Sequence, residues 1–133
     1  MSDYIFIYGT LSPDMAPDEI AHVVQQLKFV GNGFVYGKLY DLGEFPGAKL
    51  ADGKRSKIRG RVYKLPPNKQ IIKSLDAFEE FVPIRPSKSL YLRKKTRVAL
   101  ENGKTIDSWI YEYNGDTSQS PTIRGGDYSK VAA

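Results

Sequence analysis

Cysteine is absent from this chain of 133 residues, and histidine occurs once. Without cysteine there can be no disulfide bonds, thiolate nucleophiles, cysteine-ligated zinc or iron–sulfur clusters. A Ser-His-Asp triad would depend on His22, and a zinc centre would combine that histidine with carboxylates, which is an uncommon ligand set. His22 falls in a predicted helix, where a surface or partly packed side chain is the favoured interpretation. We therefore expect neither chemistry.

Long apolar runs are absent as well. No segment approaches the roughly 20 apolar residues that span a bilayer, and the start, Met1-Ser2-Asp3, lacks the basic residues and apolar run of a signal peptide. With 41% hydrophobic and 26% charged residues and a mean hydropathy of -0.42, the composition is typical of a soluble globular protein. These features predict a cytoplasmic protein of one domain, residues 1–133, without a membrane partner.

Basic residues outnumber acidic ones, 20 against 15, which gives a net charge of +5. Four of them alternate along one segment: Arg55, Lys57, Arg59 and Arg61. On a strand this period of two places them on one face, with Ile58 and Val62 on the other. A solvated sheet face is favoured over a ligand-binding stripe, because the alternation is that of a half-exposed antiparallel strand. We expect no nucleic-acid partner.

Apolar periodicity and turn residues predict five strands with two helices inserted among them. The predicted elements, in chain order, are the strand 4–8, the helix 18–28, a bend or bulge at 31–33, the strand 34–42, a loop at 43–53, the strand 58–65, the helix 68–78, a loop at 81–88, and the strands 90–100 and 105–113. The tail, about 115–133, is predicted to be irregular. Hairpins favour a mixed or antiparallel sheet, so the expected fold is α+β, a small barrel with inserted helices.

Glu79 interrupts an apolar helix face. At about 100° per residue it shares that face with Ile71, Leu75 and Phe78. Desolvation raises the pKa of a carboxyl towards neutrality, which suits a general acid/base near pH 7. Two other interpretations are open: the helix ends at Phe78 and Glu79 turns to water, or a basic residue pairs with Glu79.

The first predicted strand ends in Tyr8-Gly9-Thr10-Leu11. A glycine-containing turn at a strand end can aim successive backbone N–H groups and a threonine hydroxyl at an anion such as a carboxylate. Many ordinary turns have the same composition, so a turn without a ligand is the alternative.

Six short motifs follow one another over nearly the whole chain. They are Tyr8-Gly9-Thr10-Leu11, Gly37-Lys38-Leu39-Tyr40 with Phe45-Pro46, Gly60-Arg61-Val62-Tyr63, Leu75-Asp76 with Glu79, Tyr91 with Arg93, and Gly126-Asp127-Tyr128. In these motifs the chain resembles the γ-glutamylcyclotransferase-like (AIG2-like) family. One departure is Glu80, which stands where many members have glycine directly after the signature glutamate.

The resemblance implies a small β-barrel with helices, Glu79 as the general acid/base, and a substrate-binding turn formed by Tyr8, Gly9, Thr10 and Leu11. Enzymatic members turn a γ-glutamyl amine, amino acid or isopeptide into 5-oxoproline and a free amine. The α-amine of the substrate attacks its own γ-carbonyl, so the resemblance implies no metal, no cofactor and no protein nucleophile. The alternative is a non-catalytic module on the same fold that binds a small ligand or a protein.

Overall fold

Six strands and two helices make up the part of the chain that the computed structural model describes, residues 3–9, 16–51, 53 and 55–128. The strands are β1 (Tyr4–Ile7), β2 (Lys28–Asp41), β3 (Pro46–Leu50), β4 (Lys57–Lys64), β5 (Tyr91–Leu100) and β6 (Thr105–Tyr113). The helices are α1 (Asp18–Val24) and α2 (Lys69–Phe78), and short 3-10 turns lie at Pro86–Lys88 and Arg124–Gly126. None of the described helices is long and apolar enough to cross a membrane.

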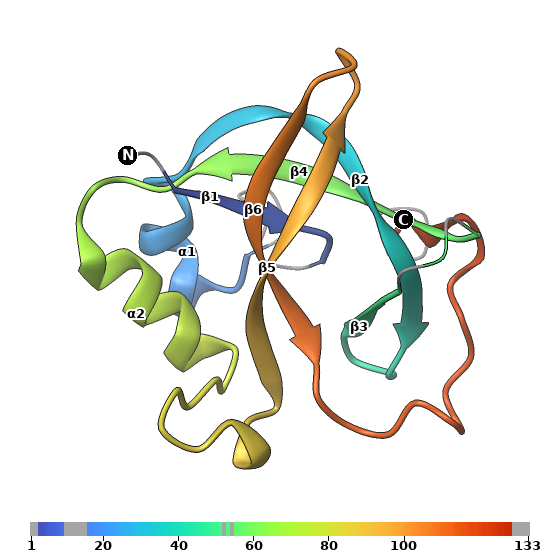
Figure 1. The fold of residues 1–133 in the computed structure, drawn as a ribbon. Helices are drawn as coiled ribbons and strands as arrows, with labels where there is room; N and C mark the ends of the chain where they lie inside the picture. Colours follow the sequence, from blue (N-terminus) through green and yellow to red (C-terminus); the bar gives the residue numbers. More distant parts are fainter. Residues whose placement is uncertain (1–2, 10–15, 52, 54, 129–133) are drawn as a thin grey trace.

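Five of the strands close into a ring, with both helices on one side of it (Figure 1). The ring runs β1, β4, β2, β5, β6 and back to β1, and β3 bridges β2 and β6. The β1–β6 and β3–β6 pairs are parallel and the others are antiparallel. A bulge in β2 lies between Phe29 and Gly31, next to the predicted one. The predicted α+β fold with a small mixed barrel is confirmed.

The predicted loop 43–53 contains the strand β3, and this part of the prediction is wrong. β3 pairs with the end of β2, from Leu50 opposite Gly37 to Pro46 opposite Asp41. Proline and glycine made the segment look like a loop, but Pro46 starts the strand, where proline is tolerated. At Gly47 a Cβ would lie 2.9 Å from Tyr113, so the close packing of β3 against β6 requires glycine there.

The two helices differ in how well local signals locate them. α2 matches its prediction because Asn68 caps it, with its side chain accepting a hydrogen bond from the Gln70 N–H at 2.9 Å. α1 ends at Val24 rather than at residue 28, because Lys28 already pairs with Lys64 in the sheet. Sheet pairing thus overrides the helical periodicity of the residues before β2.

β1 separates two parts of the hydrophobic core. Ile5 and Ile7 pack into the cluster that contains both helices, whereas Phe6 packs into a cluster formed mainly by the strands. Both faces of β1 are therefore buried, which explains its uniformly apolar sequence. The end of β1 lies where the helix layer meets the barrel, and it carries the predicted binding turn.

The described part of the segment after β6, up to Tyr128, contains the 3-10 turn Arg124–Gly126 and packs along the barrel. The Ile123 N–H donates to the Leu39 carbonyl at 2.7 Å, and the Ile123 side chain is buried. This packing brings Asp127 and Tyr128 to a cavity at the end of β1.

Candidate active site

A cavity of about 470 Å³ lies between the end of β1, the end of α2 and the start of β5. Tyr8, Gly9 and Glu79, three of the residues predicted from the sequence, all line it. Thr10 and Leu11 lie outside the residues that the structure describes. Aromatic and apolar side chains form much of the remaining wall: Phe45, Pro46, Phe78, Leu90, Tyr91 and Tyr111. In the described part of the chain no three histidine, aspartate or glutamate residues gather as a metal site would require.

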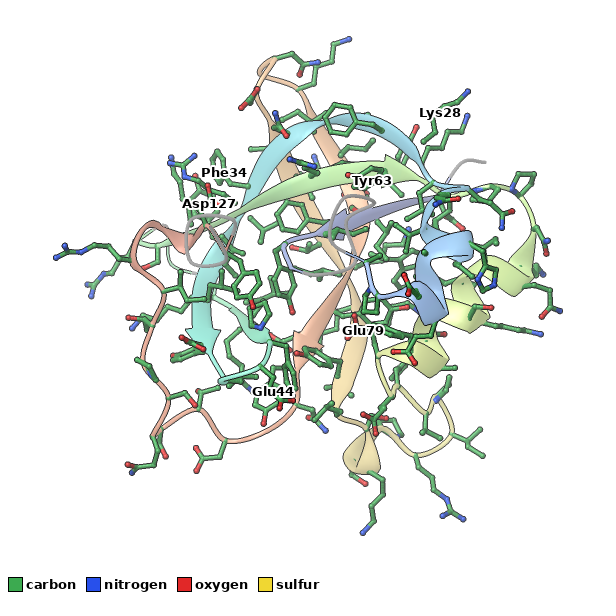
Figure 2. The ribbon with its side chains drawn as sticks, turned by 180° about the vertical axis from the view of Figure 1, so that it is seen from behind. Lys28, Phe34, Glu44, Tyr63, Glu79 and Asp127 are labelled. Atoms are coloured by element: carbon green, nitrogen blue, oxygen red, sulfur yellow. The ribbon has the colours of Figure 1, made fainter. Side chains whose placement is uncertain are left out.

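Glu79 is the residue that ends α2. The last helical residue is Phe78, and Glu79 follows as the C-cap, with its N–H donating to the Leu75 carbonyl at 2.9 Å. The helix therefore ends where one alternative interpretation placed its end. The side chain nevertheless does not turn out to water, because Glu79 is only partly exposed and lines the cavity. Figure 2 shows Glu79 where the helix meets the strands, inside the outline of the molecule.

The pKa of the Glu79 carboxyl lies near neutral pH. Burial, and to a lesser extent the negative charge of Glu80, raise its pKa from 4.5 to about 7. None of the ion pairs among the described residues involves Glu79, so the second alternative, a basic partner, is not found there. A carboxyl with such a pKa is present in both protonation states at neutral pH, and it can accept a proton and return one.

Two tyrosine hydroxyls in the cavity wall are tied to the backbone. The Tyr8 hydroxyl donates to the Tyr111 carbonyl at 2.6 Å and accepts from the Ala48 N–H at 3.3 Å. The Tyr91 hydroxyl donates to the Pro46 carbonyl at 2.7 Å. Burial is the main cause that raises the pKa of both phenols well above the ordinary value of 10. At neutral pH they are uncharged, so they shape the cavity without acting as bases.

A buried network next to the cavity connects α2 to β5 and β6. One oxygen of Asp76, Oδ1, accepts hydrogen bonds from Arg93 Nε at 2.8 Å and from the Tyr111 hydroxyl at 2.7 Å. The Arg93 guanidinium lies 4.2 Å from the centre of the Trp109 ring. Nothing in the sequence-based predictions assigned a role to Asp76, although a second carboxylate at the border of an apolar helix face was a signal for one.

Tyr111 links the two halves of the site. Its backbone carbonyl accepts the hydrogen bond from Tyr8, and its hydroxyl donates to Asp76, three residues before Glu79. One residue of β6 thus ties the end of β1 to the end of α2. The hydrogen-bonded link fixes the distance between the predicted binding turn and the carboxyl.

Residues 5–130 match the model of a family described as "Gamma-glutamyl cyclotransferase, AIG2-like". The chain belongs to this family. It is 28% identical over 126 residues to a protein of Methanocaldococcus jannaschii named "Putative gamma-glutamylcyclotransferase MJ1514", and the match covers 95% of each chain. The resemblance seen in the sequence motifs is confirmed.

Solved structures share the fold of this chain. An AIG2-like protein from Mus musculus superimposes with a TM-score of 0.73 at 22% identity, covering 95% of this chain and 88% of that one. YkqA from Bacillus subtilis superimposes with a TM-score of 0.71, also at 22% identity, over 99% of this chain. The chain spans 42% of the length of YkqA. At these identities the likeness establishes the fold alone.

Glu80, where the resemblance led us to expect glycine, has a backbone conformation that suits glycine. Its φ is 56°, the only positive φ of a non-glycine residue in the described part of the chain. The Glu80 N–H donates to the Ala77 carbonyl at 3.2 Å and the Phe81 N–H to the Asp76 carbonyl at 2.9 Å. These two bonds form a Schellman helix end, whose left-handed residue is usually glycine. Glu80 therefore occupies a strained position beside the Glu79 carboxyl.

Proposed function

We propose that the chain is a cyclotransferase that converts a γ-glutamyl amine, amino acid or isopeptide to 5-oxoproline and a free amine. The observation that carries this proposal is the Glu79 carboxyl. It is partly buried, its pKa is about 7, and it lines the same cavity as Tyr8 and Gly9. The name of the Methanocaldococcus jannaschii relative agrees with this type of reaction.

In the proposed reaction the substrate supplies its own nucleophile. The Glu79 carboxylate takes a proton from the substrate α-ammonium, and the freed amine attacks the γ-carbonyl carbon to close a five-membered ring. The bond from that carbon to the leaving nitrogen then breaks while the Glu79 carboxyl returns its proton to this nitrogen. The ring nitrogen gives its extra proton to the departing amine, so both protons shed by the α-ammonium end on the released amine. One carboxyl acts first as base and then as acid.

The turn after β1 would hold the substrate in the bent shape that ring closure needs. Its backbone N–H groups, beginning at Tyr8 and Gly9, are suited to a carboxylate or to the oxygen that becomes negative during attack. A Cβ at position 9 would lie 2.9 Å from Pro46 Cγ, so glycine allows β3 to approach the turn closely. Thr10 and Leu11 complete the proposed turn on the sequence pattern alone.

The experiment is a turnover assay with wild type, Glu79→Gln and Glu80→Gln. Each protein is incubated with γ-glutamyl amino acids, γ-glutamyl amines and γ-glutamyl-ε-lysine, and 5-oxoproline is quantified by mass spectrometry. We expect product with the wild type, a loss of at least about 100-fold in Glu79→Gln, and retained turnover in Glu80→Gln, whose carboxylate is exposed.

Two results would count against the proposal. Unchanged turnover in Glu79→Gln would rule out the proton transfer assigned to this residue. No product from any substrate with the wild type would favour the non-catalytic binding module instead.

A further inference from the structure

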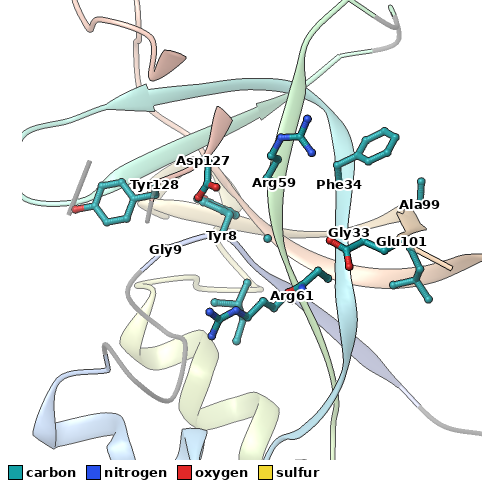
Figure 3. A pocket seen from close by; sticks show the side chains of 14 residues that line it. Tyr8, Gly9, Gly33, Phe34, Arg59, Arg61, Ala99, Glu101, Asp127 and Tyr128 are labelled. Atoms are coloured by element: carbon teal, nitrogen blue, oxygen red, sulfur yellow. The ribbon is translucent and has the colours of Figure 1, made fainter. Parts of the chain in front are cut away.

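A second cavity, of about 520 Å³, lies at the end of β1, and Figure 3 shows the residues that line it. Ile7, Tyr8 and Gly9 line both cavities. The second cavity lies on the β4 side of this segment. Ile7 pairs with Arg61 in the sheet, and the same register continued by two residues brings Gly9 level with Arg59. A ligand placed beside Gly9 can therefore reach from one cavity into the other.

Side chains of both charge signs line this second cavity. Arg59 and Arg61 come from β4, Glu101 from the β5–β6 connection, and Asp127 from the segment after β6. These are its charged lining residues among those described, and their formal charges cancel. A phosphate would meet as much repulsion as attraction in such a lining, whereas a zwitterion finds a partner for each of its charges. The lining suits an amine half that carries a carboxylate, together with a free ammonium group where the amine half has one.

Arg59 is the residue best placed to bind a carboxylate. It lies on the exposed face of β4, and in the described part of the chain no ion pair involves it. Its guanidinium can hold a carboxylate through two parallel hydrogen bonds. The alternation around Arg59 does produce the predicted exposed face, with Ile58 and Val62 buried beneath it. At Arg59 that face is also the wall of a cavity.

We propose that the second cavity binds the amine half of the substrate and selects amines that carry a carboxylate, with Arg59 as the specificity-determining residue. This inference rests on the proposed cyclotransferase function. With the γ-glutamyl group beside Glu79, the bond to be broken lies near Gly9, and the leaving amine extends along β4. Its carboxylate then meets Arg59, and a free ammonium group meets Glu101. The substrates are γ-glutamyl amino acids, including an isopeptide-linked lysine, rather than γ-glutamyl alkylamines.

A matched pair of substrates tests this inference. γ-Glutamyl-alanine and γ-glutamyl-ethylamide differ only in one carboxylate. We expect the wild-type kcat/KM to be at least about 10-fold higher for γ-glutamyl-alanine, and Arg59→Gln to lose most of this preference through a higher KM. Lys64→Gln is the control, because it removes an exposed charge from the same strand and lines neither cavity.

A binding measurement separates this inference from the proposed function. Glu79→Gln and the double variant Glu79→Gln/Arg59→Gln are titrated with both compounds by calorimetry. If γ-glutamyl-alanine binds more tightly than γ-glutamyl-ethylamide and this difference disappears when Arg59 is replaced, the proposed role of the second cavity is supported. That conclusion holds even if no compound yields 5-oxoproline, because a lack of product overturns only the proposed reaction. Equal binding of the two compounds to Glu79→Gln overturns the inference. An equal loss of affinity for both compounds when Arg59 is replaced also overturns the inference, whichever compounds the wild type turns over.

Discussion

Near the end of α2, Asp76 accepts hydrogen bonds from Arg93 of β5 and Tyr111 of β6 at 2.8 and 2.7 Å. One helical turn later, Glu79 lines the cavity and forms none of the ion pairs seen among the described residues, and its pKa is about 7. Both carboxylates belong to the same short motif. The difference between them comes from the side chains that the barrel places beside each carboxylate.

The contrast shows how one helix end can be both rigid and reactive. A buried carboxylate is well stabilised where donors converge on it, as they do on Asp76. Loss of water destabilises a carboxyl as the anion and raises its pKa, as it does for Glu79, with which no described residue forms an ion pair. Asp76, with its hydrogen bonds, positions the end of the helix, and Glu79 is available for proton exchange.

Removing the charge of Asp76 should have the largest effect on stability. Asp76→Asn removes the negative charge beside Arg93, whose side chain is only 18% exposed. We expect the free energy of unfolding, measured in urea, to fall by about 2–4 kcal/mol. Asp107→Asn is the matched control, because its ion pair with Arg97 is exposed, and it should cost less than about 1 kcal/mol. Equal losses in the two variants would contradict the anchoring role of Asp76.

Removing the charge of Glu79 should instead stabilise the protein above neutral pH. The pKa of Glu79 is about 7 in the folded protein against an ordinary 4.5, so folding takes up a proton between these values, and this contribution to stability is lost as the pH rises. Glu79→Gln should raise the free energy of unfolding by about 1–3 kcal/mol at about pH 8.

The same comparison at low pH is the internal control. At about pH 4 the carboxyl is mostly protonated in both states, so Glu79→Gln should have little effect on urea denaturation there. Absence of a gain at about pH 8 would mean that the ionised carboxylate is well solvated. That result would remove the contrast with Asp76.

Substitutions of Glu80 should have the smallest effect on stability. They also allow its charge and its backbone conformation to be altered separately. Glu80→Gly relieves the left-handed conformation at φ 56° and should stabilise the protein by about 0.5–1 kcal/mol. Glu80→Gln leaves that strain in place. Both variants remove the charge that raises the pKa of Glu79, so the acid limb of the pH profile of kcat/KM should move to lower pH in both. Equal stabilities of the two variants in urea would show that strain at this position is negligible.

Local signals explain which elements could be predicted. The cap at Asn68 and the Asn102-Gly103 turn located α2 and the β5–β6 hairpin within a residue or two, since both signals act within a few residues. β3 was not predicted, because this segment forms a strand by pairing with β2. The proline and glycine in its own sequence do not indicate that pairing. Helical periodicity likewise could not show that α1 gives way to a strand at Lys28.

The sequence by itself determined the family, the α+β class and the presence of a carboxyl on an apolar helix face, because motifs, periods and turns are properties of neighbouring residues. Only the tertiary structure decided that Asp76 is paired while Glu79 has no ion pair among the described residues, and that Arg59 and Gly9 line one cavity. Desolvation and pairing depend on side chains from β1, β4, β5 and β6, which are far apart in the chain and meet only when the barrel closes.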